Sequence, residues 1–422
     1  MRNPRRSTKV VGLLPRHSFV ASVPLRFVLY VVFLSVIGAS ISSGTYSRGF
    51  ESQQPGGHEF RAVGSGIEHL RITRGQKTEN EATGPWLINL LRVDPKQLHL
   101  RIAHALDEGV GLETTSSIAA RYDALAAMNA GFFRTTGTYR GESSGVLMID
   151  GKLISEPLEG RAAIGFIEGA ITSEVIFGHL RFSGRLESIR GRRFAVDGLN
   201  RPRGANELVV YTPEFHRNTL TTPDGVEVIC RRNRIIHIRD GRGSGAIPVE
   251  GFVLSASGVA REWVIANLRA GSPIRLDLRL MPVETEKRDK WNRASFIVGG
   301  GPQLIKAGRI AITFEEEKVA PRFVNDRHPR SAIALLRDGR VLLATVDGRQ
   351  PGVSAGMSLP EFARLLLEFD ASEAINLDGG GSTTMVVNGK VVNTPSDQTG
   401  ERPVSDAILL IPRRLQQKRA VH

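Results

Sequence analysis

The sequence predicts an α+β fold of mixed β-sheets with many hairpins, few helices and one C-terminal βαβ unit. Short apolar runs broken by Gly, Pro and Asn recur from residue 67 onward, which is typical of strands. Tight turns interrupt several of these runs, and helical periodicity is confined to a few short segments. We therefore expect one large domain over residues 67–412, with a β-rich middle segment at about 164–280.

The first 66 residues differ in character from this domain. Six basic residues precede an uncharged run from Phe27 to Ser47, and its apolar core, Phe27 to Ile37, is short for a membrane span and fits a signal sequence. Residues 1–41 therefore predict a basic leader with a hydrophobic signal or anchor, which exports the chain or holds it to the membrane by one N-terminal helix. Residues 42–66, rich in Ser, Gly and Gln, predict a flexible linker.

The basic charge of the chain lies at its two ends. Residues 1–50 carry seven Lys and Arg, the tail at 413–422 carries four, and neither segment has an acidic residue, so the formal charge of +13 leaves only +2 for residues 51–412. A nearly neutral body gives no support for a nucleic-acid-binding face. The single cysteine, Cys230, excludes an intramolecular disulfide, and its apolar surroundings predict a buried small hydrophobe.

The elements of the domain follow in chain order. Apolar or alternating runs predict strands at 67–72, 86–93, 98–103 and 124–128, and a short helix with a hydroxyl cap is predicted at 115–122. The middle segment adds strands at 207–211, 225–229, 235–238 and 251–255, with helical periodicity only around 259–270. Hairpins are predicted at 144–154, 295–310 and 385–392.

These hairpins belong to a pattern that occurs three times. An apolar strand ends in a polar or glycine loop, and a hairpin follows whose turn closes in Gly151-Lys152, Gly308-Arg309 or Gly389-Lys390. Either an internal repeat or common hairpin chemistry explains the pattern. In both cases, three loops of matching type predict one convergent site.

The last part of the domain predicts the βαβ unit. A strand at 340–346 is followed by a helix at 359–369, which Ser358 caps, and by a strand at 374–377. A right-handed parallel crossover places the carboxyl ends of both strands at one edge of the sheet. Asp347 and Asp378, which follow these strands, are therefore expected at the same edge, where ligands of open α/β sheets bind.

The turn after Asp378 is the leading candidate for a binding loop. Its three glycines tolerate positive φ and close approach of a ligand, so their N–H groups are expected to form a concave anion site with two hydroxyls beside it. The residues concerned are Gly379, Gly380, Gly381, Ser382 and Thr383. A second glycine triplet contributes Gly300 and Gly301, and neither triplet matches a Walker loop or a dinucleotide fingerprint. A plain turn capped by Asp378 is the alternative.

Five ordered motifs resemble the phosphodiester glycosidase family. They are Asn129-Ala-Gly-Phe-Phe133, Gly299-Gly-Gly-Pro302, Pro329-Arg-Ser-Ala-Ile333, Val346-Asp-Gly-Arg349 and Asn376-Leu-Asp-Gly-Gly-Gly-Ser-Thr-Thr384. The resemblance covers roughly residues 86–412. It implies an α+β domain of mixed sheets and a hydrolase that cleaves a sugar-1-phosphodiester, releasing the sugar and leaving a phosphomonoester.

This chemistry assigns expected roles to the polar residues. Because phosphate is a weakly basic leaving group, stabilising it and activating a nucleophile matter more than a general acid. Asp378 is the candidate nucleophile or base and Asp347 its partner, with turn capping as the alternative for both. Asn129 is expected to hold a sugar hydroxyl or N-acetyl group, unless it only closes its turn.

Arginines are the expected ligands of the phosphate. Arg330 and Arg349 are the candidates, because a guanidinium binds phosphate bidentately, and a structural ion pair is the alternative for each. Glu142 and Glu401 are second-tier acids. Clustered metal-ligand spacings are missing around Asp347 and Asp378, so no cofactor is expected and the metal question stays open.

The expected function is that of an exported glycosidase acting on sugar-phosphate diesters of a polysaccharide or cell-surface glycopolymer. Two other functions fit the same residues. One is a phosphodiesterase that cleaves the P–O bond, and the other is a non-catalytic glycan-binding module in envelope or exopolysaccharide assembly. A glycan or sugar phosphate is the expected ligand in each case.

Overall fold

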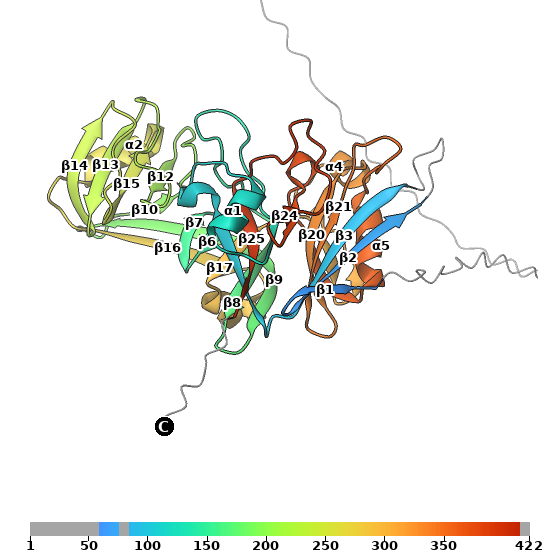
Figure 1. Ribbon diagram of the computed structural model, residues 1–422. Coiled ribbons are helices and arrows are strands. Elements are labelled where there is room, and N and C mark those ends of the chain that lie inside the picture. The colour runs from blue at the N-terminus through green and yellow to red at the C-terminus, as the bar shows by residue number, and fades with distance from the viewer. Residues whose placement is uncertain (1–58, 76–83, 414–422) are drawn as a thin grey trace, which may run out of the picture. The chain divides into compact units, whose positions relative to one another are not determined.

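The computed structural model describes residues 59–75 and 84–413 (Figure 1). The predicted leader, most of the predicted linker and all but the first residue of the basic tail lie outside these ranges. Within them, no helix is both long enough and apolar enough to cross a membrane. The linker prediction is wrong at its C-terminal end, because Arg61–Gly64 forms a strand, β1, which pairs with β2 (Ile67–Arg74).

Four β-sheets and a few short helices make up the described residues, which confirms the predicted α+β class. The eight-stranded sheet has the order β1, β2, β3 (Trp86–Val93), β21 (Val341–Val346), β20 (Arg330–Leu336), β22 (Ala371–Asn376), β18 (Gln303–Lys306) and β19 (Arg309–Ile310). A second sheet has the order β10 (Arg193–Val196), β9 (Ser173–Ser188), β8 (Ala162–Glu168), β17 (Phe296–Gly299), β6 (Leu147–Ile149) and β7 (Lys152–Ser155), and β16 (Ile274–Pro282) pairs with β9.

The two smaller sheets have five strands each. One has the order β24 (Lys390–Val391), β23 (Met385–Val387), β5 (Ala126–Asn129), β25 (Asp406–Pro412) and β4 (Leu98–His104). The other has the order β11 (Gly198–Leu199), β12 (Leu208–Tyr211), β15 (Gly251–Ala256), β13 (Val226–Arg231) and β14 (Arg234–Asp240). The α-helices are α1 (Thr115–Arg121), α2 (Gly258–Asn267), α3 (Arg288–Arg293), α4 (Pro321–Asn325) and α5 (Leu359–Glu368).

Three copies of one structural unit form the centre of three of the sheets, namely the eight-stranded sheet, the seven-stranded sheet and the five-stranded sheet that contains β5. Each unit consists of a leading strand, a hairpin and a return strand: β5, β6–β7 and β8; β17, β18–β19 and β20; β22, β23–β24 and β25. The leading strand of each unit pairs with the hairpin and the return strand of the unit before it. The first leading strand, β5, pairs in the same way with β23 and β25 of the third unit. The three units therefore close into a ring.

The register of these pairings repeats residue by residue. Asn129, Gly299 and Asn376 hold equivalent positions, because their strand partners are Ala407, Ala163 and Ala332. Their N–H groups donate to the equivalent carbonyls of Thr384, Val146 and Pro302 at 3.2, 2.7 and 3.1 Å. Hairpin chemistry alone would not produce this agreement. The three loops found in the sequence are therefore parts of an internal repeat, and the repeat brings three strand ends together.

The βαβ unit is present, with one strand inserted into it. Both β21 and β22 run antiparallel to β20, which lies between them, so they run parallel to each other. Helix α5 starts with the predicted Ser358 cap, completed by Glu361 as a capping box, and buries Phe362 and Leu366 against one face of the eight-stranded sheet. The carboxyl ends of β21 and β22 therefore lie at one edge of the sheet, as predicted.

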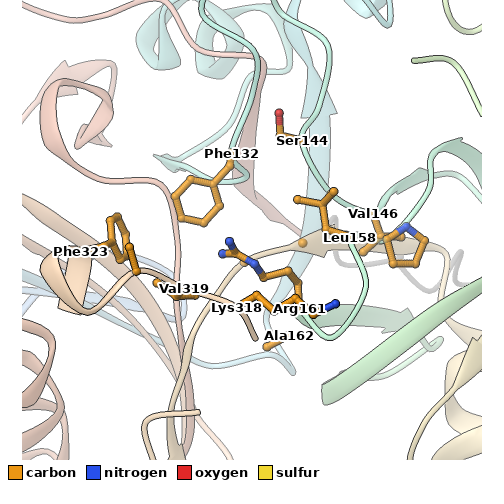
Figure 2. Close-up of a pocket in the computed structure, with 14 residues that line it drawn as sticks. Phe132, Ser144, Val146, Leu158, Arg161, Ala162, Lys318, Val319 and Phe323 are labelled. Atoms are coloured by element: carbon orange, nitrogen blue, oxygen red, sulfur yellow. The ribbon is translucent and has the colours of Figure 1, made fainter. Parts of the chain in front are cut away.

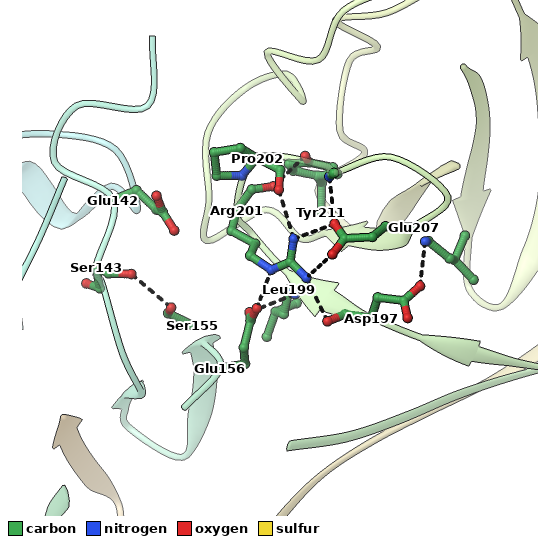
Figure 3. A network of polar contacts seen from close by, with 12 residues as sticks. Glu142, Ser143, Ser155, Glu156, Asp197, Leu199, Arg201, Pro202, Glu207 and Tyr211 are labelled. Atoms are coloured by element: carbon green, nitrogen blue, oxygen red, sulfur yellow. Dashed lines mark hydrogen bonds and ion pairs between the residues drawn. The ribbon is translucent and has the colours of Figure 1, made fainter. Parts of the chain in front are cut away.

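The predicted strands of the middle segment form a sheet with its own core, built by β11–β15 and α2 (Figure 1). Arg201 ties this sheet to the end of β7. Its guanidinium contacts Glu156 and Glu207, each at 2.6 Å, and the amide of the neighbouring Asn200 donates to the Ile154 carbonyl at 2.8 Å (Figure 3). The sheet is thereby fixed to the first repeat unit.

Candidate functional site

Asn129 holds together the loops where two leading strands end. It stands at the end of β5, is fully buried, and donates its Nδ2 to the carbonyl of Asp378 at 2.7 Å. Its Oδ1 accepts the hydroxyl of Ser331 at 2.8 Å and the N–H of Thr384 at 3.1 Å. The side chain has no exposed surface for a sugar, so its geometry fits a positioning residue better than the expected sugar ligand.

Asp378 is the one aspartate of Asp347, Asp378 and Asp406 that is not fully buried as a residue. It follows β22, is partly exposed, and accepts the N–H of Gly379 on its Oδ1 at 2.9 Å. Burial raises its pKa to about 6, against the opposing effects of Ser382, the Gly379 N–H and Arg402. The buried carboxylate of Asp406 raises this pKa further. A partly exposed acid that titrates near neutral pH is what a nucleophile or base requires.

The glycine turn offers fewer N–H groups than expected. Gly379 donates to Asp378, Gly380 to the Pro329 carbonyl at 2.9 Å, and Ser382 to the Gly379 carbonyl at 3.2 Å. Thr383 donates to the Gly380 carbonyl at 3.3 Å, which leaves the N–H of Gly381 as the one in this turn without a partner among the described residues. The expected concave site of several backbone donors is therefore largely absent, and side chains must supply most of the contacts to an anion.

Two arginines lie against this turn. Arg349 is exposed, and its Nη2 and Nη1 lie 3.0 and 3.1 Å from the position that a Cβ on Gly380 would take. Arg402, paired with Asp397 at 2.7 Å, similarly lies where a Cβ on Gly381 would be. Gly380 and Gly381 thus let two guanidinium groups approach the backbone closely. Of the expected phosphate ligands, Arg349 is the one placed at the turn.

His328 lies beside Arg349 and can accept a hydrogen bond from it. Its Nδ1 lies 3.4 Å from Nη2 of Arg349. Burial lowers the pKa of His328, and the charges of Arg330 and Arg349 lower it further, so the imidazole is neutral at pH 7. Among the described residues the guanidinium of Arg349 has no carboxylate partner, which leaves it available to an anionic ligand.

Arg330 is in a different position from the one expected of a phosphate ligand. It is 1% exposed, and it donates to the carbonyls of Met357, Phe323 and Asp326 at 2.9, 2.8 and 2.8 Å. Burial lowers its pKa to about 10, and the charge of Arg349 contributes to this shift. Three of its N–H groups are committed to the main chain. Arg330 therefore orders the segments around His328 rather than presenting an open fork to a phosphate.

Asp347 does not reach the surface either. It is 1% exposed, and its two oxygens accept Nδ2 of Asn393 at 3.0 Å and the N–H of Thr394 at 2.9 Å. Burial raises the pKa of this carboxyl, while these two donors oppose the shift. Asn393 also donates to the Thr383 carbonyl at 3.0 Å. Asp347 thus anchors the chain that holds the glycine turn, which corrects its expected role as the second reacting carboxylate.

The two second-tier acids lie elsewhere in the fold. Glu142 is 6% exposed, pairs with Arg134 at 3.0 Å, and faces the network around Arg201 (Figure 3); burial raises its pKa. Glu401 accepts the N–H of Ser116 at 2.7 Å, at the start of α1. Both residues have structural partners. Over the described ranges, no group of three or more His, Cys, Asp or Glu side chains is arranged to hold a metal ion.

A cavity of about 470 Å³ opens between the first two repeat units. Its lining includes Phe132 and the predicted Gly300. Phe132 follows two residues after Ala130, and the Ala130 carbonyl accepts the N–H of Asp378 at 2.9 Å. The remaining lining residues are Ser144, Gly145, Val146, Pro157, Leu158, Arg161, Ala162, Gly299, Lys318, Val319, Ala320 and Phe323 (Figure 2). Gly301 borders it, since a Cβ there would lie 3.5 Å from Nη1 of Arg161.

Two functional candidates were missed at the sequence level. Asp406 starts β25, is 1% exposed, and accepts the N–H of Gly131 and the hydroxyl of Ser405, each at 2.6 Å. An aspartate at the head of a fully apolar strand was a signal for it. The other is Arg161, for which the signal is that Arg161-Ala-Ala-Ile164 matches Arg330-Ser-Ala-Ile333 at the same place in the repeat.

A strand-end carboxylate titrating near neutral pH, beside a glycine turn flanked by arginines, defines a domain suited to a charged ester. Residues 224–411 match the family model described as phosphodiester glycosidase, which is the family that the motifs predicted. Members of this family are hydrolases. Asp378, Asp347, Arg330 and Arg349 lie within the matched range, and Asn129 and Arg161 lie outside it.

Named relatives agree with this family. The chain is 30% identical over 178 residues to the mouse (Mus musculus) N-acetylglucosamine-1-phosphodiester alpha-N-acetylglucosaminidase, which is 40% of this chain and 33% of the mouse protein. The match thus spans a third of the length of that relative. A solved protein from Burkholderia pseudomallei is 28% identical with a TM-score of 0.66, over 78% of this chain and 75% of its own. A protein from Synechocystis shares the fold at 24% identity and a TM-score of 0.70, over 83% and 62% of the two chains.

Proposed function

We propose that this chain hydrolyses the bond between C1 of a sugar and the phosphate of a phosphodiester, which releases the sugar and leaves a phosphomonoester. The observation that carries the proposal is Asp378, a partly exposed carboxylate with a pKa of about 6, next to a turn that Arg349 approaches closely. The family match and the activity named for the mouse relative support it.

In the proposed reaction, Asp378 supplies the nucleophile or base, and the donors beside it stabilise the leaving phosphate. Asp378, largely ionised at pH 7, attacks C1 directly or removes a proton from the attacking water. Negative charge then builds on the leaving phosphate oxygen, which needs little protonation because phosphate is a weak base. Arg349, neutral His328 and the free N–H of Gly381 are the donors available to this charge.

We further propose that the protein is exported, or held to a membrane by its leader, and acts on a polysaccharide or cell-surface glycopolymer. The basic leader and its apolar run support export. A sugar-phosphate polymer outside the cytoplasm is a substrate that such a protein would meet.

The decisive experiment is incubation of the protein with UDP-N-acetylglucosamine in ¹⁸O-labelled water. Cleavage at C1 places the label in the free sugar, whereas attack at phosphorus places it in a phosphate-bearing product and would refute the glycosidase. Asp378→Asn should abolish turnover. Asp150→Asn, in the exposed turn of the β6–β7 hairpin at φ +49°, is a matched control that should leave turnover unchanged. A wild-type protein that binds glycans without any turnover would instead support the non-catalytic module.

A further inference from the structure

Arg161 is a cation without a partner in the wall of a cavity. It precedes β8, is half-buried, and its guanidinium points toward Phe132 and Phe323 (Figure 2). Over residues 59–75 and 84–413, its side chain makes no hydrogen bond and no ion pair. Burial lowers the pKa of Arg161, which shows that the charge is held in poorly solvated surroundings.

The equivalent arginine of the second unit has a different environment. Arg161 and Arg330 both stand two residues before the alanine that pairs with the leading strand of the next unit. Arg330 gives its N–H groups to three main-chain carbonyls, which accounts for its burial. No hydrogen bond from the side chain of Arg161 to a main-chain carbonyl is present among the described residues. The same position in the repeat therefore carries an arginine bound to the main chain in the second unit and an arginine without hydrogen-bond partners among the described residues in the first.

The nearest carboxylate is already engaged by other donors. Glu317 is fully buried, and its oxygens accept the N–H of Ala162 at 3.0 Å, the N–H of Gln303 at 2.7 Å and the hydroxyl of Thr313 at 2.5 Å. Its attraction partly offsets the burial of Arg161, but its acceptor sites are largely taken. The donors of Arg161 are thus available to an anion that enters the cavity.

The opposite wall suits a ring. Phe132 and Phe323 meet edge to face, with their centroids 6.2 Å apart and an interplanar angle of 65°. Val146, Leu158 and Val319 complete the apolar lining. A volume of about 470 Å³ accommodates a hexose with room to spare. Aromatic faces bind the C–H faces of a pyranose, and a guanidinium opposite them binds a charged substituent.

We propose that this cavity is the sugar-phosphate pocket of the protein, in which Arg161 binds the phosphate and Phe132 and Phe323 hold the hexose ring. The proposal deepens the function given above and rests on it. It names Arg161, which lies outside the residues that match the family model, as a phosphate ligand in addition to the donors beside Asp378, which do not themselves line the cavity.

Binding of two small probes tests the assignment. Affinities of the full-length protein for inorganic phosphate and for α-glucose 1-phosphate are measured by calorimetry. Arg161→Ala should weaken both probes about 10- to 100-fold, which is the range for loss of charge-assisted hydrogen bonds. Phe132→Ala should weaken only the sugar phosphate. Arg161→Lys keeps the positive charge but loses the two-pronged guanidinium, so its affinity for both probes should lie between those of the wild type and Arg161→Ala. This variant also keeps the test open if Arg161→Ala does not fold.

Arg322→Ala is the matched control, because this arginine is 90% exposed, pairs with Asp326, and adjoins Phe323 in sequence. Wild-type affinities in both Arg161 variants would overturn the proposal, and so would an equal loss in Arg322→Ala. Phosphate binding that depends on Arg161 without turnover of any sugar phosphodiester supports the pocket and refutes the glycosidase. Turnover of a sugar phosphodiester together with phosphate binding that does not depend on Arg161 supports the glycosidase and refutes the pocket.

Discussion

The pKa of Asp378 leads to a specific pH dependence. If Asp378 acts as nucleophile or base, kcat/KM follows its ionised fraction in the free enzyme. With a pKa of about 6, roughly 90% of the group is ionised at pH 7 and about 10% at pH 5. We therefore expect kcat/KM for a sugar-1-phosphodiester to fall about ninefold between these two pH values. An aspartate at the ordinary value of 3.8 would lose less than about 10%.

The assay is release of free sugar at low substrate concentration between pH 4.5 and 8. A phosphodiester keeps one negative charge throughout this range, so the acidic limb belongs to the enzyme. Arg402→Gln should move the limb to higher pH, because the charge of Arg402 lowers the pKa of Asp378. His328→Gln removes the other candidate group and should leave the position of the limb unchanged. A flat profile down to pH 5, or a limb that disappears with His328, would refute the assignment of Asp378.

Three further predictions concern the same edge of the sheet. Asp378→Asn should raise the unfolding free energy by about 3 kcal/mol at pH 8, measured by urea titration, because burial raises the pKa of Asp378 from 3.8 to about 6 and so penalises its charged form in the folded protein. The gain should shrink as the pH falls from 6 to 4, because Asp378 is then protonated in the folded protein. Gly380→Ala should lower kcat/KM at least tenfold, because the added Cβ would lie 3.0 Å from Nη2 of Arg349. Gly389→Ala is the control and should leave kcat/KM unchanged: its φ of +73° is similar to the +62° of Gly380, but no atom lies within 4 Å of the added Cβ. Asn129→Ala should lower the unfolding free energy by about 3 kcal/mol, because three hydrogen bonds of a fully buried side chain are lost. Thermal or urea unfolding measures this change, and a decrease below about 1 kcal/mol would contradict the bridging role of Asn129.

The β scaffold was accessible from the sequence because its signals are local. Apolar runs and turn residues located β3, β4, β12 and β15 to within a residue or two, and the Ser358 cap located the start of α5. The repeat of strand, loop and hairpin was visible for the same reason. The sixteen-residue β9 was missed, because its more exposed half, residues 181–188, is mostly polar and has only Phe182 and Leu186 as apolar residues.

The orientation of the charged side chains was not accessible in this way. Arg330 and Asp347 have the residue types expected of a phosphate site, yet their partners come from segments such as 353–357 and 393–394, which only the folded chain brings to them. The N–H groups of the glycine turn were assigned to a ligand, although three of them donate to acceptors within the turn itself; only the acceptor of Gly380, the Pro329 carbonyl, lies about fifty residues away. Arg161 was overlooked although its motif repeats that of Arg330.

The ring of three units has a consequence for synthesis of the protein. Strand β5 has neither of its neighbours until β23 and β25 are made, and β4 pairs with β25, which ends at Pro412. A growing chain therefore exposes unpaired strand edges over most of its translation, and these edges are sites for aggregation. Closure across about 300 residues is entropically slow. A truncation that removes β25 would leave β4 without its strand partner and β5 with β23 alone, so this sheet is complete only when the chain has been made as far as Pro412.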